Sequence, residues 1–423
     1  MKHPVVAWGV AAAAFVLLAI WGLPAVRATG PARAGLKPAE RACTSFCLDN
    51  AGQAVFGANY DNNIWEGLLF VNKRGVTKTG WEAGTTGRYA RWTAEYGSVT
   101  FNLAGVQMAW AGMNEAGLAI STMWLGETRD PTPDERPPLV SPLWIQYQLD
   151  TCATLAEVMA NDARVRVADV VDHYLVCDRS GACAAVEFLE GETVFHAGHA
   201  LPVKALTNDG YRLSAAAWQA GRLMSNSLQR FGIAAGRVTS FQPTDSASAV
   251  AYAFDTLEQA SGQVTGGTPT QWSIVFDTAN RCIYWRTSRI PQVRFVDFAR
   301  LEFACGTPVD MLDVHAPLTG DVSDKLGPYS FAANLQSTLN FVDKSRETDL
   351  SEFEIEVLER GVETFACERP AAPYQEEKER LLPPVVGWAA RALLYRYWPA
   401  LIVVGLGIAA VLGRRALAWS RRR

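Results

Sequence analysis

A cysteine at a small-residue junction is the residue best suited to chemistry in this chain. Cys43 follows Ala42 and opens the first strand-like segment after a stretch rich in Ala, Arg, Pro and Gly. Four interpretations compete: half of a disulfide, a lipid anchor, a buried apolar residue, or a nucleophile that becomes the first residue of the mature protein. Glu40 and Arg41 disfavour the lipid anchor, because lipidation requires an apolar sequence directly before the cysteine.

Histidine is scarce, which limits how a cysteine nucleophile could be activated. The chain has five histidines, and none lies in a recognisable triad motif. A cysteine at a new N-terminus needs no histidine, because its own α-amino group, with an ordinary pKa of about 8, can accept the thiol proton. Such a site also needs two hydrogen-bond donors for the oxyanion, typically an Asn amide and a backbone N–H.

The apolar patterns of the chain indicate which elements position this cysteine. Strand-like segments joined by tight turns cover residues 43–50, 54–61, 97–125, 172–198 and 271–288. Apolar residues return every three or four positions in 141–161 and 214–236, which predicts helices there. Strands interrupted by helices favour an α+β fold in which two sheets lie between helix layers.

The two ends of the chain predict a protein held outside the cytoplasm. Residues 1–28 contain an uncharged segment and small-residue cleavage sites, so they read as a signal peptide or N-terminal membrane segment. Residues 397–413 carry no charge and have arginines behind them, which predicts a transmembrane helix with a basic cytoplasmic tail at 414–423. The main domain would lie on the extracytoplasmic side of the cell membrane, on a single-pass tether. A chain ending near Pro383 should then no longer sediment with membranes.

The eight cysteines suit an oxidising compartment, where disulfides persist. Cys177 and Cys183 bracket a tight turn and are expected to bridge a hairpin. Cys305 and Cys367 are the candidates for a second pair. With Cys43 set aside an odd number remains, so at least one further thiol is expected to stay unpaired.

The rest of the composition disfavours metals, cofactors and nucleic acid. No CxxC pair is present, and His196 and His199 lack further ligands, so a solvent-exposed turn is expected there rather than a zinc site. The formal net charge of -4 comes without a basic stripe, which disfavours nucleic acid as a partner. No cofactor is expected, and a homo-oligomer is compatible with the sequence.

Five short motifs follow one another in a characteristic order and spacing. They are CTSF at residue 43, GANYD at 57–61, GMNEAGLAIS at 112–121, LTND at 206–209, and QRF followed by TQWSIVFD. In this order the chain resembles the choloylglycine hydrolase and penicillin V acylase family of N-terminal nucleophile hydrolases, from about Cys43 to Thr287. The resemblance implies a four-layer αββα sandwich, self-exposure of the cysteine, and hydrolysis of linear amide C–N bonds.

The same resemblance implies roles for individual residues. Cys43 matches the nucleophile, and Asp61 matches the carboxylate that orients its thiol and amine. Asn208 matches the oxyanion-hole amide, and Trp124 the residue whose backbone N–H completes that hole. Arg230 matches the arginine that completes the polar site.

One position departs from the family pattern. Ala58 stands where members usually carry an arginine, so a guanidinium close to the thiol is lost. The departure keeps open a membrane-tethered binding protein on a non-catalytic hydrolase scaffold, and an acyltransferase that passes the acyl group to an amine is the other alternative. The main interpretation is a hydrolase of small acyl amides, such as conjugated bile salts, penicillin V or N-acyl homoserine lactones, acting through a thioester.

This interpretation divides the chain into consecutive parts. A propeptide at 29–42 precedes the N-terminal nucleophile hydrolase domain at 43–305. A helical extension at 306–370 and a linker at 371–396 lead to the transmembrane helix. The expected partners are the small acyl amide substrate and, through that helix, the membrane.

Overall fold

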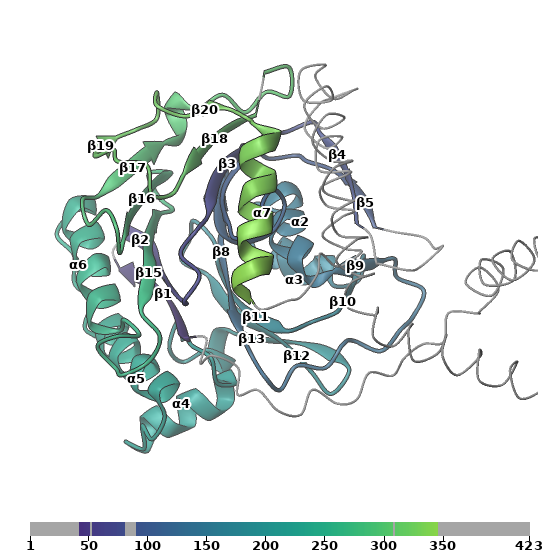
Figure 1. Cartoon of the computed structure of the whole chain (residues 1–423). Helices are drawn as coiled ribbons and strands as arrows, with labels where there is room; N and C mark the ends of the chain where they lie inside the picture. The colour runs from purple at the N-terminus through teal and green to yellow at the C-terminus, as the bar shows by residue number, and fades with distance from the viewer. Residues whose placement is uncertain (1–41, 51–52, 81–89, 308, 346–423) are drawn as a thin grey trace, which may run out of the picture. The chain divides into compact units, whose positions relative to one another are not determined.

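The structure, a computed structural model, describes residues 42–50, 53–80, 90–307 and 309–345 (Figure 1). The predicted signal segment, the propeptide up to Arg41, the linker, the transmembrane helix and the basic tail lie outside these residues. Cys367, the predicted partner of Cys305, lies outside them as well. Within the described ranges, no helix is both long and apolar enough to span a bilayer.

The first of two large sheets carries Cys43. Its described strands are, in spatial order, β14 (Ala205–Leu206), β1 (Ala42–Asn50), β2 (Gln53–Asp61), β15 (Thr270–Asp277), β16 (Cys282–Thr287), β17 (Arg294–Asp297) and β19 (Gly320–Asp321). β1 and β2 form an antiparallel hairpin that pairs Cys43 with Tyr60, and β15 pairs with the other edge of β2. Residues far apart in the sequence therefore lie beside Cys43.

The second sheet lies against the first. Its described strands are, in spatial order, β13 (Glu192–Ala197), β12 (Cys183–Leu189), β11 (Asp172–Cys177), β8 (Ala119–Trp124), β7 (Ala109–Asn114), β6 (Ser98–Asn102), β3 (Leu68–Asn72), β18 (Asp310–Asp313) and β20 (Gly327–Pro328). Every residue of β6 and β7 is buried, because both faces of this sheet are covered. Shorter elements are β4 (Thr77–Thr79) with β5 (Arg91–Thr93), β9 (Pro138–Val140) with β10 (Arg166–Ala168), and the 3-10 turns η1 (Ser141–Leu143), η2 (Gly198–Ala200) and η3 (Phe298–Arg300).

Helices cover the outer faces of both sheets (Figure 1). α5 (Asn226–Thr239) packs against β1, α6 (Ser246–Gln259) against β2 and β15, and α4 (Tyr211–Gln219) against α5. On the second sheet α2 (Trp144–Thr151) packs against β7 and β8, and α3 (Leu155–Asn161) follows it. Helix, sheet, sheet and helix thus succeed one another, and the predicted α+β class with large sheets is confirmed.

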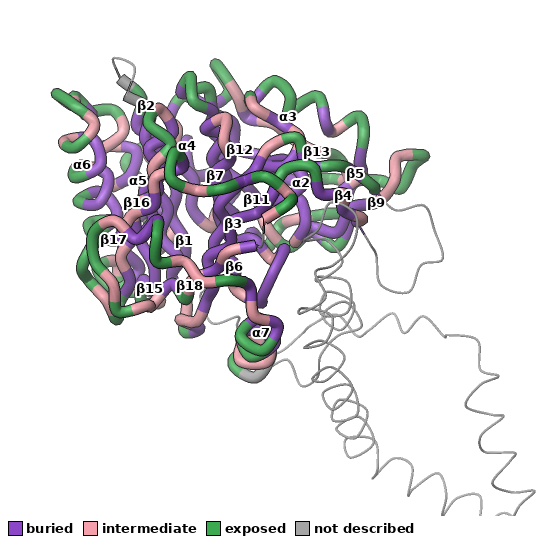
Figure 2. The backbone as a smooth tube through the Cα atoms, turned by 90° about the horizontal axis from the view of Figure 1, so that it is seen from above, coloured by how far each residue is buried: buried purple, intermediate pink, exposed green. Residues whose placement is uncertain are grey.

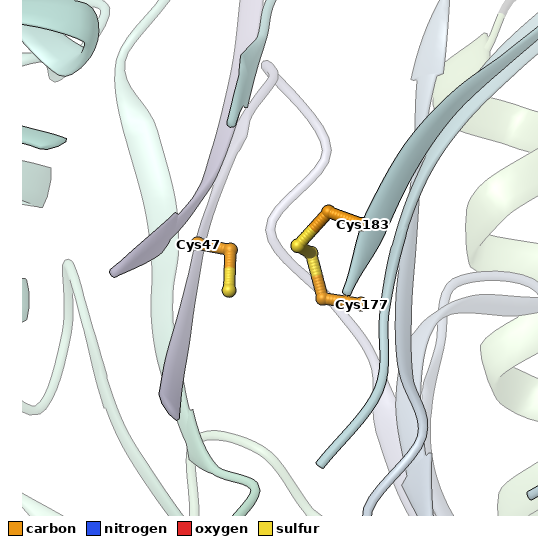
Figure 3. Close-up of side chains that lie close together, drawn as sticks. All are labelled: Cys47, Cys177 and Cys183. Atoms are coloured by element: carbon orange, nitrogen blue, oxygen red, sulfur yellow. A yellow bond between two sulfur atoms is a disulfide. The ribbon is translucent and has the colours of Figure 1, made fainter. Parts of the chain in front are cut away.

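The inner faces of the two sheets share one apolar core, and the strands are buried along most of their length (Figure 2). β1 lies against β8, where the hydroxyls of Ser45 and Ser121 are 2.5 Å apart. The predicted bridge between Cys177 and Cys183 is present and joins β11 to β12. Cys47 of β1 faces this disulfide from the opposite sheet as a buried free thiol, as Figure 3 shows. The expectation of a further unpaired thiol is therefore confirmed.

Two local expectations are corrected by the structure. The extension predicted to be helical from residue 306 opens with β18, β19 and β20, because backbone pairing with β3 and β17 holds these segments extended. Helix α7 (Phe331–Ser345) follows them. His196 lies in strand β13 and is 2% exposed, rather than in an exposed turn, because its ring bonds to the buried carboxylate of Glu187. His199 is exposed.

Candidate active site

Cys43 lies near the start of β1, within the strand rather than at a chain end. Its side chain is 4% exposed, and its backbone N–H donates a hydrogen bond of 2.6 Å to Asn208 Oδ1. Burial, with a smaller contribution from the charge of Asp61, raises the pKa of the Cys43 thiol to about 12. The thiol is therefore protonated at neutral pH in the uncut chain, whereas the nucleophilic form of a cysteine is the thiolate.

Asn208 lies in the bend between β14 and α4. Its side chain spans the site: Oδ1 accepts from Cys43, and Nδ2 donates to the backbone carbonyl of Trp124 at 2.9 Å. Its own backbone N–H donates to Ser227 Oγ of α5 at 3.0 Å. The amide is therefore fixed from both sheets and from the helix layer.

Arg230 reaches the site from α5, a helix capped at its N-terminus by the Ser225 side chain. The guanidinium is buried and donates to the carbonyl oxygen of Cys43, to Thr44 Oγ1 at 2.9 Å and to Asn208 Oδ1 at 3.0 Å. Burial lowers the pKa of Arg230, while the charge of Asp61 raises it. The positive charge thus lies against the backbone of the predicted nucleophile.

Asp61 ends β2, opposite Ala42 in the hairpin register. One of its oxygens accepts a hydrogen bond from the Thr270 hydroxyl, and the other, Oδ2, is buried with no hydrogen-bond partner among the described residues. Burial raises the pKa of Asp61 to about 7, against the lowering effects of Arg230, Thr270 and the Gly262 backbone N–H. An incompletely bonded carboxylate therefore lies beside the predicted nucleophile.

The structure thus brings the five predicted site residues together at one end of the two sheets. Trp124 was expected to contribute its backbone N–H, and the described contact uses its carbonyl oxygen instead. Ala58, at the position of the family arginine, is buried in the middle of β2 between Ser45 and Ile274. The charge of Arg230 lowers the pKa of the Cys43 thiol, but burial outweighs this effect.

An aromatic cluster lines the inner face of the sheet next to the thiol. Tyr60 is the direct partner of Cys43 in the hairpin, and Trp272 is the partner of Tyr60 on its other side. The ring centroids of Tyr60 and Trp272 are 4.7 Å apart, and Trp110 of the facing sheet lies 5.3 Å from Tyr60. The aromatic cluster therefore lies on one side of Cys43, and the polar groups of Asp61, Asn208 and Arg230 lie on the other sides.

Several contributors to the site were not predicted from the sequence. Thr270 bonds to Asp61 across 209 positions of sequence, and Asn226 accepts from Arg230 Nε at 2.8 Å. Ser227 orients Asn208 through its hydroxyl. No local pattern marks these residues, because their roles follow from the pairing of β2 with β15 and from the placement of α5.

Comparison with known proteins bears directly on this arrangement. Penicillin V acylase from Pectobacterium atrosepticum is 26% identical over 273 residues, covering 52% of this chain and 72% of the relative. Among solved structures, penicillin V acylase from Agrobacterium tumefaciens aligns with a TM-score of 0.60 at 24% identity, over 68% of this chain and 98% of that one. No family model matches the chain.

A second kind of neighbour extends the comparison. A variant of conjugated bile acid hydrolase from Clostridium perfringens aligns with a TM-score of 0.54 at 13% identity, over 64% of this chain and 96% of that one. The chain is thus similar in sequence to a penicillin V acylase, and in fold to structures of penicillin V acylase and of conjugated bile acid hydrolase. Its fold is that of the N-terminal nucleophile hydrolases, and the predicted enzyme class, an amide hydrolase of this type, is confirmed.

Proposed function

We propose that this amide hydrolase acts through Cys43 after cleavage of the Ala42–Cys43 peptide bond. The observation that carries the proposal is the hydrogen bond of 2.6 Å between Cys43 N and Asn208 Oδ1. The nitrogen that cleavage would convert into an α-amino group already has its acceptor, and Arg230 holds the carbonyl oxygen of the same residue. The site is thus built around the backbone of Cys43 as well as its thiol.

Cleavage would activate the thiol. An amide nitrogen cannot take up a proton, whereas the α-amino group released by hydrolysis of the Ala42–Cys43 bond has an ordinary pKa of about 8 and can. It would accept the thiol proton, directly or through a water. The resulting ammonium would lower the pKa of the thiol, which burial holds at about 12 in the uncut chain.

The thiolate would then attack the amide carbonyl of the substrate. Nδ2 of Asn208 carries two protons, one of which bonds to the Trp124 carbonyl, so the second can donate to the oxyanion. When the tetrahedral intermediate collapses, the C–N bond breaks and the leaving amine takes the proton from the α-ammonium group. A thioester to Cys43 remains. Water, deprotonated by the free α-amine, hydrolyses it to release the acid and restore the thiol.

The aromatic cluster of Tyr60, Trp110 and Trp272 supports a substrate with an apolar acyl group. Tyr60 is paired with Cys43, and the rings of Trp110 and Trp272 pack against Tyr60, so an acyl group held at the thiol would lie near this cluster. The relatives are named for penicillin V and for conjugated bile acids, which share the linear amide bond. We therefore expect acyl amides with apolar or aromatic acyl chains to be hydrolysed, and polar short-chain amides to be poor substrates.

A panel of acyl amides read by mass spectrometry tests the proposal. The purified full chain should release acids from apolar acyl amides, its mature N-terminus should read Cys-Thr-Ser-Phe, and Cys43→Ala should abolish turnover. Cys43→Ser should turn over poorly, because an alcohol is far less acidic than a thiol. Acyl transfer to an added amine in place of water would favour the acyltransferase alternative. An active mature protein that retains residues before Cys43, with this cysteine in a disulfide, would refute the proposal.

A further inference from the structure

A buried ion cluster that the mechanism does not use lies behind Asn208. Glu187 of β12 is 1% exposed and accepts three hydrogen bonds: from His173 Nδ1 at 3.2 Å, from His196 Nε2 at 2.8 Å and from the Tyr211 N–H at 2.7 Å. The two histidines come from β11 and β13, the strands on either side of β12. A single carboxylate therefore ties three neighbouring strands to the start of α4.

The cluster reaches the catalytic amide through the main chain. His173 Nε2 lies 2.6 Å from the carbonyl oxygen of Thr207, the residue directly before Asn208. Because a carbonyl oxygen only accepts, Nε2 is the donor. The Tyr211 N–H, which bonds to the same Glu187, lies at the other end of this bend. Glu187 thus holds both ends of the segment 207–211, directly at one end and through His173 at the other.

Moving charged groups out of water costs free energy that hydrogen bonds only partly offset. Stabilisation of the fold is therefore not enough to explain a buried ion cluster. Burial by itself would raise the pKa of Glu187, but the hydrogen bonds from the two histidines outweigh it and lower the pKa to about 2. The Glu187 carboxylate therefore remains ionised at neutral pH. A permanently charged anchor suits a bend that must not move.

We propose that Glu187 and His173, supported by His196, are positioning residues that hold the bend 207–211 and thereby orient the Asn208 amide toward the oxyanion. This inference rests on the proposed function, because it presupposes that Asn208 serves the reaction. None of the three side chains contacts the thiol. Their effect should fall on turnover rather than on substrate binding, since the oxyanion forms only after attack.

Glu187→Gln, compared with Asp150→Asn, separates positioning from general stability. Asp150 is an equally buried carboxylate, bonded to Lys78, Trp92 and Gln146, and none of these partners touches the bend. Because small displacements of a catalytic group are costly, Glu187→Gln should lower kcat roughly a hundredfold with KM little changed. Asp150→Asn should lower the melting temperature and leave kcat near the wild-type value. Equal kcat in the two variants at matched loss of stability would overturn the proposal.

Two substitutions at His173 keep the test valid if Glu187→Gln does not fold. In His173→Gln, the amide Nε2 lies where the ring Nε2 was and retains a donor for Thr207 O. In His173→Asn, the amide nitrogen replaces the ring Nδ1 and retains only the contact to Glu187. His173→Gln should therefore keep more of kcat than His173→Asn. The reverse order, or equal losses, would show that the histidine merely supports Glu187.

Hydrogen exchange read by mass spectrometry separates failure of this proposal from failure of the proposed function. In the full chain, amides of the segment 207–211 should exchange faster in Glu187→Gln than in the wild type or in Asp150→Asn. A wild type without amide turnover would refute the proposed function, and faster exchange of this segment would still support the positioning role. Unchanged exchange and unchanged kcat in Glu187→Gln would refute the positioning role while leaving the hydrolase intact.

Discussion

Asp61 beside Cys43 and Glu187 behind Asn208 are both fully buried carboxylates, yet the fold treats them in opposite ways. Asp61 accepts a hydrogen bond from Thr270, its Oδ2 has no hydrogen-bond partner among the described residues, and burial raises its pKa to about 7. Glu187 receives three donors, and they overcome burial and lower its pKa to about 2. One oxygen of Asp61 thus has no hydrogen-bond partner among the described residues, whereas both oxygens of Glu187 accept hydrogen bonds.

The difference matches the tasks inferred for the two regions. A carboxylate with all its hydrogen bonds made fixes geometry, which suits the bend that carries Asn208. A carboxylate oxygen without a hydrogen bond is costly to bury in the uncut chain, and the α-ammonium group that cleavage would create at Cys43 would add a positive charge to that of Arg230. We therefore expect cleavage before Cys43 to relieve the burial cost of Asp61. The next three predictions address this contrast.

The largest effect is expected from Asp61→Asn in the uncut chain. A folded-state pKa raised from 3.8 to about 7 contributes stability that is fully present below pH 3.8 and is lost as the pH rises through 7. In the Cys43→Ala background, with an intact N-terminus verified by mass, the parent should lose on the order of 4 kcal/mol relative to Asp61→Asn between pH 4 and pH 8. Denaturant titrations of the full chain at several pH values measure this. Parallel pH dependences of the two proteins would contradict the raised pKa.

Glu187→Gln should give the opposite pH dependence and a somewhat smaller effect. A folded-state pKa lowered from 4.5 to about 2 contributes stability that is present above pH 4.5 and is lost as the pH falls through 2. At neutral pH the variant should therefore be less stable than the parent by on the order of 3 kcal/mol, and the difference should shrink in acid. The same titrations provide the measurement. A difference that persists at pH 2 would assign the loss to packing rather than to charge.

How much of this could be predicted from the sequence differs between elements. The β1–β2 hairpin and the strands around the Cys177–Cys183 bridge can be predicted from the sequence, because apolar alternation and tight turns are local signals. The helix predicted over 214–236 is two helices, α4 and α5, separated at Gly221, whose positive φ of 66° ends the first. The local signal gave the element type but missed the break.

The site residues also differ in whether local sequence signals identify them. Cys43 and Asn208 were identified because they stand in family motifs, whereas Thr270 and Glu187 were missed because strand pairing and strand order, not sequence spacing, bring them into the site. His196 was misread as part of an exposed turn because its neighbours Ala197 and Gly198 look like a turn, and only the pairing of β13 with β12 shows that it is buried. The site residues that lie outside the motifs are therefore brought together by long-range strand pairing.

Asn208→Ala tests the residue that joins the two regions. Its amide bonds to the Cys43 backbone on one side, and its main chain belongs to the bend held by Glu187 on the other. Loss of one oxyanion donor costs roughly a hundredfold or more in kcat, about 2.7 kcal/mol, and KM should change little because the donor acts after attack.

Asn161→Ala is the matched control for Asn208→Ala. Asn161 is a buried side-chain amide in α3, bonded to Gln148, Thr151 and Cys152, none of which contacts the site. Asn161→Ala should reduce stability without reducing kcat. Steady-state kinetics of both variants therefore distinguish the general effect of removing a hydrogen-bonded amide from the specific effect of removing an oxyanion donor. If Asn208→Ala retained wild-type kcat, Asn208 would be a structural tie between Cys43 and Trp124, and the contrast between Asp61 and Glu187 would concern stability alone.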